Sequence, residues 1–263
     1  MLDDLALPQG LDGWVGHHVA GMPVRAHRHV ELEVNLVIRG TATYLLGERR
    51  YRLGPGTLTW LFPAQDHVLV DQSADHELWW AVFAPELVSR IATGPLLADD
   101  PAGEFCRRVP AGLARRLRML CEEIHLADID NPRITNTGLA YLLALAWQTF
   151  LDSDDIVTGT DVHPAVRAAA RLLQTDPDAG DLPHLARVVG LSPSHLSRLF
   201  KAQTGIPLNR YRNQQRLHRF HLAYGNGEHT TALAAALAAG FGSYAQFYRV
   251  FRQETGRNPG RDH

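Results

Sequence analysis

The sequence predicts an α+β protein in which a strand-rich N-terminal part is followed by helices only. Three observations lead to this prediction. Short alternating segments separated by turn residues occupy positions 25–83, which is typical of a barrel or sandwich. Apolar residues at helical spacing follow between positions 112 and 151. After position 160, one sequence motif with helical spacing occurs twice, and we call it the repeated phrase.

The first expected strand is VELEVNLVI, residues 30–38, in which the even-numbered side chains are apolar. Because side chains alternate along a strand, its odd-numbered positions form a separate face, which could line an interior or meet water. Five more strands are expected in segments punctuated by glycine and proline: TATYLL, RRYRL, GTLTWLF, HVLV and ELWWAVF. Strands this short predict a small closed or double-sheet structure.

Two helices are expected next, at 112–126 and 136–151. Their leucines could cover the sheets or pair two copies of the chain, and the spacing leaves both possibilities open. These leucines are Leu113, Leu117, Leu120, Leu139, Leu142, Leu143 and Leu145. The polar segment 152–163 lacks periodicity and is expected to be a linker. It would separate an N-terminal domain, 1–151, from a C-terminal domain, 164–263.

The C-terminal domain is expected to hold six helices, at 164–174, 182–189, 193–203, 207–223, 230–238 and 244–255. The third and sixth lie in the repeated phrase, which reads LSPSHLSRLFKAQTG at 191–205 and FGSYAQFYRVFRQETG at 241–256. Ser192 and Ser243 are placed to cap these two helices, and the final glycine of each phrase is placed to end them.

Each repeated helix has an apolar stripe and a polar, basic outer face. The outer residues are Ser194, Ser197, Arg198 and Lys201 in the first copy, and Gln246, Arg249 and Arg252 in the second. A helix, a short turn that contains glycine and a second helix together form the helix-turn-helix pattern. The second helix of this pattern enters a DNA major groove. There, arginine can address guanine and glutamine can address adenine. A helical repeat that binds nothing charged is the alternative.

The charge distribution favours DNA binding. The net charge is −2, but the charges are unevenly distributed. From residue 161 onward there are 13 Lys and Arg and 7 Asp and Glu, whereas the residues before it contain 13 Lys and Arg and 21 Asp and Glu. A basic C-terminal part joined to an acidic N-terminal part indicates a polyanion-binding domain carried by one of another kind.

The C-terminal domain resembles the DNA-binding domain of AraC-family transcription regulators, through LARVVGLSPSHLSRLFKAQTGIPLNRYRNQQRL and AAGFGSYAQFYRVFRQETGRNP. The resemblance implies two helix-turn-helix units joined by a linker helix. It assigns base contacts to Ser194, Ser197, Arg198, Ala245, Gln246 and Arg249. Three departures stand out: Ala245 offers only a methyl group, Asp262 replaces an aromatic residue, and Phe220 stands where the linker helix often has alanine.

The N-terminal domain resembles a cupin barrel. GMPVRAHRHVELEVNLVIRG and GTLTWLFPAQDHVLV match the two cupin motifs, and the resemblance places His27, His29, Glu33 and His67 at the metal-ligand positions. Such a set suits a divalent transition metal. Regulatory cupins also bind organic effectors without metal, and both occupants remain open. Trp60, Phe62, Trp79 and Trp80 could border the site, although aromatic residues in strands more often lie in a core or an interface.

Together these features predict a sequence-specific transcription regulator whose cupin-like β-barrel and helical pair sense a small molecule or metal. The expected partners are double-stranded DNA, a small-molecule effector and a second copy of the chain. We expect a cytoplasmic protein without a membrane span, in which Cys106 and Cys121 are reduced. The alternative is a metal-dependent cupin enzyme with an appended helical domain. Only the regulator needs the duplicated recognition helix.

Overall fold

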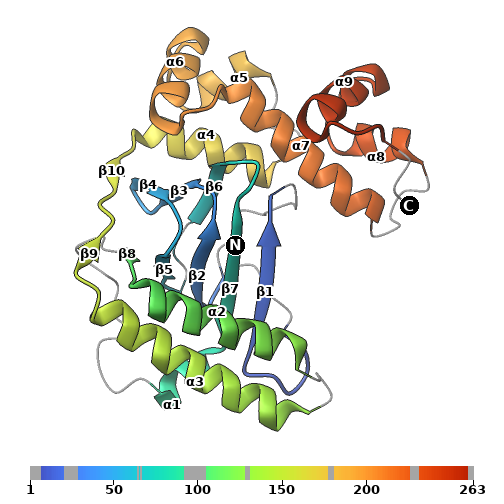
Figure 1. Ribbon diagram of the computed structural model, residues 1–263. Helices are drawn as coiled ribbons and strands as arrows, with labels where there is room; N and C mark the ends of the chain where they lie inside the picture. The colour runs from blue at the N-terminus through green and yellow to red at the C-terminus, as the bar shows by residue number, and fades with distance from the viewer. Residues whose placement is uncertain are drawn as a thin grey trace. The chain divides into compact units, whose positions relative to one another are not determined.

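A computed structural model describes residues 7–20, 29–63, 65, 67–91, 105–127, 131–176, 181–225 and 231–259 (Figure 1). The chain divides into two compact units, and the main division falls between Asp161 and Val162. None of the helices in these ranges is both long and apolar enough to span a lipid bilayer.

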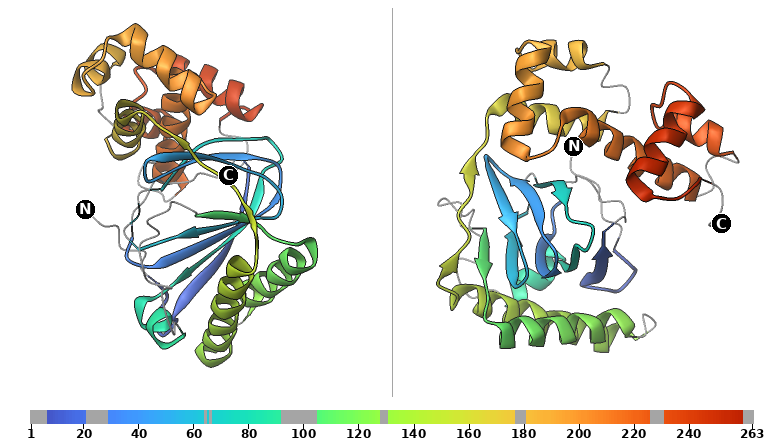
Figure 2. Two further views of the ribbon diagram at one scale, coloured as in Figure 1. Left: turned by 90° about the vertical axis from the view of Figure 1, so that its left-hand side faces the viewer. Right: turned by 45° about the horizontal axis from the view of Figure 1, so that its top comes forward.

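The first unit contains two β-sheets (Figure 2). The larger sheet has the strand order β1-β7-β2-β5-β8-β9 and is antiparallel throughout, and the smaller has the order β10-β4-β3-β6. The strands are β1 (Gly13–Val19), β2 (Leu32–Arg39), β3 (Ala42–Leu46), β4 (Arg49–Leu53), β5 (Thr57–Leu61), β6 (His67–Gln72), β7 (Glu77–Phe83), β8 (Cys106–Arg108), β9 (Asp155–Ile156) and β10 (Thr160–Asp161). Strands β2 to β7 coincide with the six expected segments.

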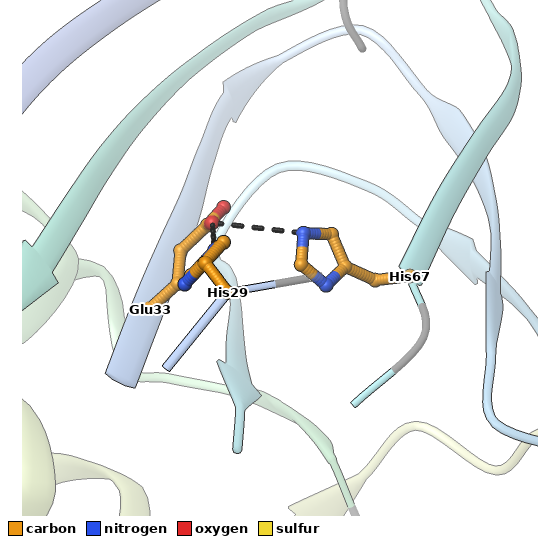
Figure 3. Close-up of side chains that lie close together, drawn as sticks. All are labelled: His29, Glu33 and His67. Atoms are coloured by element: carbon orange, nitrogen blue, oxygen red, sulfur yellow. Dashed lines mark hydrogen bonds and ion pairs between the residues drawn. The ribbon is translucent and has the colours of Figure 1, made fainter. Parts of the chain in front are cut away.

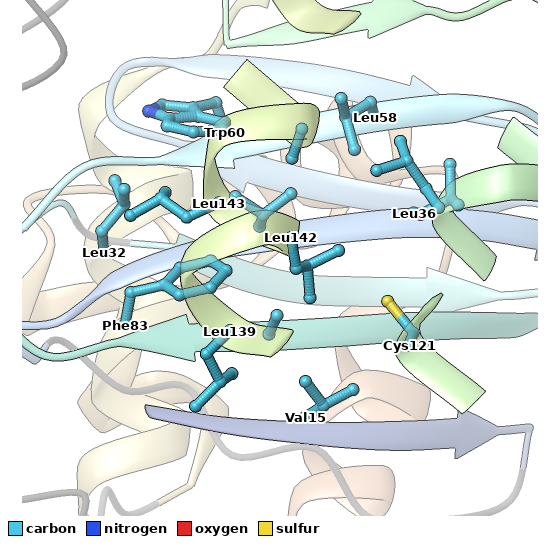
Figure 4. Packing of buried hydrophobic residues seen from close by; sticks show 14 of the residues in the cluster. Val15, Leu32, Leu36, Leu58, Trp60, Phe83, Cys121, Leu139, Leu142 and Leu143 are labelled. Atoms are coloured by element: carbon cyan, nitrogen blue, oxygen red, sulfur yellow. The ribbon is translucent and has the colours of Figure 1, made fainter. Parts of the chain in front are cut away.

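Three helices belong to the first unit: α1 (Pro85–Ile91), α2 (Ala111–Leu126) and α3 (Pro132–Leu151). Helices α2 and α3 pack together and cover one face of the larger sheet, where α3 places three leucines over the strands (Figure 4). Burying each leucine stabilises the fold by about 1.5–3 kcal/mol. The core leucines of the pair are Leu117, Leu139, Leu142 and Leu143.

These four leucines therefore cover the sheet and do not form a surface for a second copy of the chain. Leu120 and Leu145 are partly buried against the same core, and Leu113 is also partly buried. Of the two possibilities left open by the spacing, the structure supports covering of the sheet for the inner leucines. A contact between copies through α2 and α3 would have to use the outer face of the pair.

Strand β2 is buried on both faces. Its even-numbered Val34 and Leu36 join the core beneath α2 and α3. Its odd-numbered Glu33 and Asn35 are also buried, at 6% and 2% exposure, and face the smaller sheet, where His67 of β6 approaches Glu33. The odd face therefore lines the interior between the sheets and does not meet water.

The segment 152–163, expected to be a linker, is paired to both sheets. Strand β9 pairs with β8, and β10 pairs with β4. The guanidinium of Arg107 donates hydrogen bonds to the main-chain oxygens of Phe150 and Ser153, at 3.0 and 3.2 Å. Two-residue strands are too short to show a period of two, so the sequence gives no sign of them.

The second unit is helical, and its elements fall within two residues of the expected ranges. They are α4 (Pro164–Thr175), α5 (Leu182–Val188), α6 (Pro193–Thr204), α7 (Leu208–Gly225), α8 (Ala232–Ala238) and α9 (Tyr244–Thr255). Helices α5 and α6 form one helix-turn-helix pair, α8 and α9 form the other, and α7 lies between them in the chain (Figure 1).

The linker helix α7 contributes a bulky residue to the core of the second pair. Phe220 is 3% exposed, and its ring centroid lies 4.4 Å from that of Phe247 and 6.1 Å from that of Phe251. Phe220 thereby fills space that an alanine would leave empty, which accounts for this departure from the family pattern. Asp262, the other C-terminal departure, lies outside the described residues.

Candidate functional site

Helix α6 is fixed at both ends by local contacts. Ser192 is its N-cap, and the serine oxygen accepts a hydrogen bond from the main-chain N–H of His195 at 3.3 Å. The helix ends at Gly205, which has a φ of +89°, a conformation that favours glycine. Thr204, the last helical residue, donates its hydroxyl to the main-chain oxygen of Phe200 at 2.7 Å. These contacts set which side of α6 faces the core.

The apolar stripe of α6 is buried through Leu196 and Phe200, both at 0% exposure. On the opposite side, Ser194, Arg198 and Lys201 are exposed. Ser197 is partly buried. The structure therefore places the three exposed candidates on one accessible surface, with Ser197 at its edge.

Helix α9 repeats this construction. Ser243 caps it by accepting from the N–H of Gln246 at 3.2 Å, and Gly256 ends it with a φ of +72°. Thr255 donates to the main-chain oxygen of Phe251 at 2.7 Å, as Thr204 does in α6. The buried residues are Phe247, Val250 and Phe251, and the exposed ones include Ala245, Arg249 and Arg252.

The side chain of Gln246 is already bonded within the protein, whereas the candidate Ser194 has only a long contact of 3.4 Å with the hydroxyl of Ser192. Its amide oxygen accepts a hydrogen bond from the main-chain N–H of Gly242 at 2.9 Å, and the residue is partly buried. This resembles a capping box, in which a glutamine three residues after the capping serine accepts from the N–H of that serine, except that the donor here is the residue before the serine. The sequence Ser-Tyr-Ala-Gln carries that signal. Gln246 therefore supports the start of α9 through the oxygen that an adenine contact would require.

His195 occupies the equivalent position in α6, three residues after Ser192, and its side chain is exposed. An imidazole can donate to or accept from a base edge. The sequence interpretation did not assign His195 to the DNA-contacting face. Aligning the two copies by their capping serines, Ser192 and Ser243, would have identified the position.

Three candidate metal ligands meet in the interior of the first unit (Figure 3). One ligand atom from each of His29, Glu33 and His67 lies within 4.8 Å of the others. The Nε2 atoms of His29 and His67 lie 3.0 and 3.7 Å from Glu33 Oε2. All three residues are at most 6% exposed. The fourth expected ligand, His27, lies outside the described residues.

The surroundings of this cluster orient the two imidazoles. His29 Nδ1 lies 3.0 Å from the main-chain oxygen of Glu31, and His67 Nδ1 lies 3.1 Å from that of Gln65. A carbonyl oxygen only accepts, so each Nδ1 carries a proton. The Nε2 atom of His29 then approaches the Glu33 carboxylate with a lone pair, unless a proton or a cation lies between them. Metal-bound histidines have this same arrangement.

Two further groups complete the interior near Glu33. Asn35 donates its amide N–H to Glu33 Oε1 at 2.9 Å. Burial, with a smaller contribution from the charge of Glu33, raises the pKa of Tyr44 on the smaller sheet. The Tyr44 hydroxyl therefore stays protonated well above neutral pH.

Most of the aromatic residues expected to border this site lie elsewhere. Trp60, Phe62 and Trp79 belong to the core beneath α2 and α3, on the face of the sheet opposite to Glu33. Of the two placements left open, the core applies to these three, because strand parity places them with the even face of β2. Trp80 lies opposite Asn35 in the register of β2 and β7 and shares the interior face.

Comparison with known proteins follows the same division of the chain. A model of the AraC-like ligand-binding domain matches residues 19–143, and a model of a helix-turn-helix domain matches residues 185–262. The chain belongs to the AraC family of transcription regulators. It is a DNA-binding regulator in which an N-terminal ligand-binding domain precedes the helix-turn-helix domain, as the sequence predicted.

Curated relatives of this AraC-family chain are named as regulators. It is similar to the HTH-type transcriptional activator RhaR of Yersinia pestis, with 26% identity over 89% of this chain and 82% of RhaR. It is also similar to the regulatory protein ada of Salmonella typhimurium, with 37% identity over 35% of this chain and 25% of ada. Among solved structures, ToxT from Vibrio cholerae aligns with a TM-score of 0.43 and 11% identity, over 94% of this chain and 96% of ToxT.

Proposed function

We propose that this regulator reads DNA by inserting α6 and α9 into major grooves, with Arg198 and Arg249 contacting bases. Each arginine is exposed, and each precedes a buried phenylalanine, Phe200 or Phe251, by two residues. The observation that carries the proposal is this equivalent placement on two helices with the same caps. Lys201 is assigned to phosphate contact in this proposal, as Arg252 is on α9.

A binding selection on randomised duplex DNA with the full chain tests this assignment. Arg198→Ala and Arg249→Ala should each relax base preference at one position, since a bidentate arginine–guanine pair discriminates by about 1–3 kcal/mol. Lys201→Ala is the matched control, because loss of a phosphate contact weakens all sequences alike and lowers the salt slope by about one. Unchanged base preferences in both arginine variants would show that α6 and α9 do not read sequence through these residues.

For the sensing domain, we propose that the effector binds at the buried polar cluster around Glu33. Asn35 Oδ1 is buried and, within the described part of the chain, accepts no hydrogen bond. Leaving such an acceptor unsatisfied costs about 1–3 kcal/mol, which a ligand with a hydrogen-bond donor would offset. Trp80 shares this face. These features support a small polar effector.

A divalent transition metal is the second candidate at the same cluster. The residues fit such an ion, because two imidazoles with outward-bonded Nδ1 atoms and one carboxylate converge there. His29, Glu33 and His67 would hold the metal, and it would supply a Lewis-acidic position for an effector oxygen or nitrogen. Elemental analysis of the wild-type protein and of His67→Ala separates the two candidates. Metal that is present in wild type and lost in the variant supports the ion. If neither protein contains metal, the result supports an organic effector alone.

The same ligands could serve a metal-dependent cupin enzyme. We propose a sensing role, since the curated relatives are named as regulators and the second unit carries two helix-turn-helix pairs. An effector found by its stabilisation of the purified chain should be recovered chemically unchanged. Its conversion to a product would favour the enzyme.

We also propose that the chain forms a homodimer through the outer face of α2. Met119 is 57% exposed there, with Arg115 one turn before it and Glu123 one turn after it, both exposed. A two-fold axis near Met119 would bring two antiparallel copies of α2 together. Residue 115 of each copy would then lie opposite residue 123 of the other. The face is therefore self-complementary in charge.

A further inference from the structure

A second pair of buried imidazoles lies at the other end of the first unit from Glu33. In the antiparallel register of β2 and β7, Glu33 lies opposite Val82, whereas the far end of β2 pairs with the start of β7. His76 immediately precedes β7, and His18 lies on the neighbouring strand β1. The two rings are 1% and 6% exposed, with centroids 5.8 Å apart.

The turn that carries His76 is held in place on several sides. The main-chain oxygen of Ser73 accepts a hydrogen bond from the main-chain N–H of His76 at 3.0 Å. The hydroxyl oxygen of Ser73 accepts a second one from the main-chain N–H of Thr41 at 2.8 Å. Gly40, with a φ of +70°, lies so close that a Cβ there would be 2.7 Å from His76 Cα. Position 76 is therefore preorganised, as a ligand position requires.

Hydrogen bonding fixes the tautomer of His18. Its Nε2 lies 2.9 Å from Oε1 of Gln72, an oxygen that only accepts, so Nε2 carries the proton and Nδ1 carries the lone pair. His76 differs: the main chain of Arg39 lies near the ring and favours a proton on one of its nitrogens, and the other nitrogen has no hydrogen-bond partner in the described part of the chain. An unsatisfied buried nitrogen costs about 1–3 kcal/mol. This end of the unit therefore has a vacant lone pair that needs a partner.

Both rings are neutral at physiological pH. The pKa of His76 is lowered to about 4, chiefly by burial and then by the nearby His18, while the main chain of Arg39 and the charge of Asp75 partly oppose this lowering. Burial also lowers the pKa of His18. The carboxylates close by are engaged elsewhere: Glu77 binds His17 and Arg39, and Asp75 accepts from Ser73. The pair therefore offers neutral nitrogen ligands, and Asp75, which is exposed, exerts only a small charge effect on His76.

We propose that His18 and His76 bind a soft monovalent metal ion, copper(I), between β1 and the turn before β7. Imidazole is a good ligand for copper, and copper(I) accepts two nearly linear ligands. Zinc, by contrast, takes four ligands in structural sites. The cost of burying an ion grows with the square of its charge, so a site with two neutral ligands favours a single charge. Gln72 would act from behind His18 as the oxygen that orients it.

This inference is independent of the cluster at Glu33, and the two can be tested separately. Purified full-length chain is titrated anaerobically with copper(I) against a chromogenic chelator. We expect one bound equivalent in wild type, its loss in His18→Leu and in His76→Phe, and its retention in His29→Ala and Cys121→Ala. Equal copper content in wild type and in both folded histidine variants would overturn the proposal, as would loss in Cys121→Ala instead.

Two measurements keep the test decisive if a histidine variant fails to fold. Gln72→Leu leaves both imidazoles in place and should weaken copper(I) about tenfold or more, because outer hydrogen-bond partners contribute about 10- to 100-fold to metal affinity. In wild type, silver(I) serves as a redox-inert substitute and should shift the ring resonances of His18 and His76 together. If silver(I) shifted neither ring, water alone would satisfy these nitrogens. If zinc bound as tightly as copper(I), the argument from the charge of the ion would be wrong.

Discussion

Replacing Gln246 with alanine should loosen the first turn of α9 before it affects base preference. The change removes one hydrogen bond of 2.9 Å, from Gly242 N–H to the Gln246 amide oxygen, at a partly buried position. A neutral hydrogen bond of this kind contributes about 1 kcal/mol, close to the typical value of a helix cap. The Ser243 cap remains, so the helix should persist with a weaker start.

Hydrogen exchange measures this effect locally, which avoids treating a two-unit chain as a single two-state system. A loss of about 1 kcal/mol corresponds to an approximately fivefold faster exchange of the Gly242 amide. Gln246→Glu should restore protection, because glutamate keeps the accepting oxygen and its charge suits a helix N-terminus. His195→Ala, at the equivalent position of α6, is the matched control. Because the side chain of His195 is exposed, this change should leave amide exchange at the start of α6 unchanged.

The opposite result would assign Gln246 to sequence reading. If Gln246→Ala left Gly242 protection intact and relaxed preference at a single base pair, the hydrogen bond seen here would not contribute to stability. Gln246 would then belong with Arg249 as a reader. If His195→Ala alone altered base preference, the two helices would use equivalent positions for different purposes.

Three further outcomes are expected. Arg198→Ala should reduce affinity for the selected site about 5- to 150-fold while sparing affinity for random DNA, measured by fluorescence anisotropy at fixed salt; equal losses on both would identify a phosphate contact. Arg115→Glu and Glu123→Arg should each dissociate the dimer in analytical ultracentrifugation, and the double exchange should restore it, whereas a dimer unaffected by all three would exclude this face. Burial raises the pKa of both Cys106 and Cys121 to about 12, so both should remain thiols at pH 9 and resist alkylation until unfolding; rapid labelling of native protein would contradict this.

The helices of the second unit could be predicted closely because their signals are local. Ser192 and Ser243 each sit directly before a helix, and Gly205 and Gly256 each sit directly after one. A cap or a left-handed glycine acts within one turn, so the sequence alone determines it. The boundaries therefore did not depend on knowing how the unit packs.

The interior of the first unit could be predicted only in part, because it depends on contacts between distant segments. The alternation of β2 separates Glu33 and Asn35 from Val34 and Leu36, but both faces of the strand are covered. Alternation cannot tell a polar lining from a surface exposed to water. The convergence of His67 on Glu33 requires the pairing of two sheets, which the cupin motif supplied and the spacing did not.

Strand parity also explains why most of these aromatic residues lie in the core and not beside Glu33. Trp60 and Trp79 sit on strands in register with β2, Trp60 opposite Val34 and Trp79 opposite Leu36. Directly opposite residues share a face of the sheet, so both tryptophans had to join the helix-covered core. Their assignment needed the register, which no short-range signal in the sequence specifies.

The two copies of the repeated phrase show which positions the fold constrains and which it leaves to function. The capping serine, the phenylalanine of the buried stripe and the Thr-Gly ending are kept in both copies because each fixes the helix within its pair. The outer positions have no such constraint, and there the copies diverge, with His195 exposed in α6 and Gln246 bonded to its own turn in α9. A duplicated scaffold with independent outer faces can address two different base sequences. A simple helical repeat would have no need for that divergence.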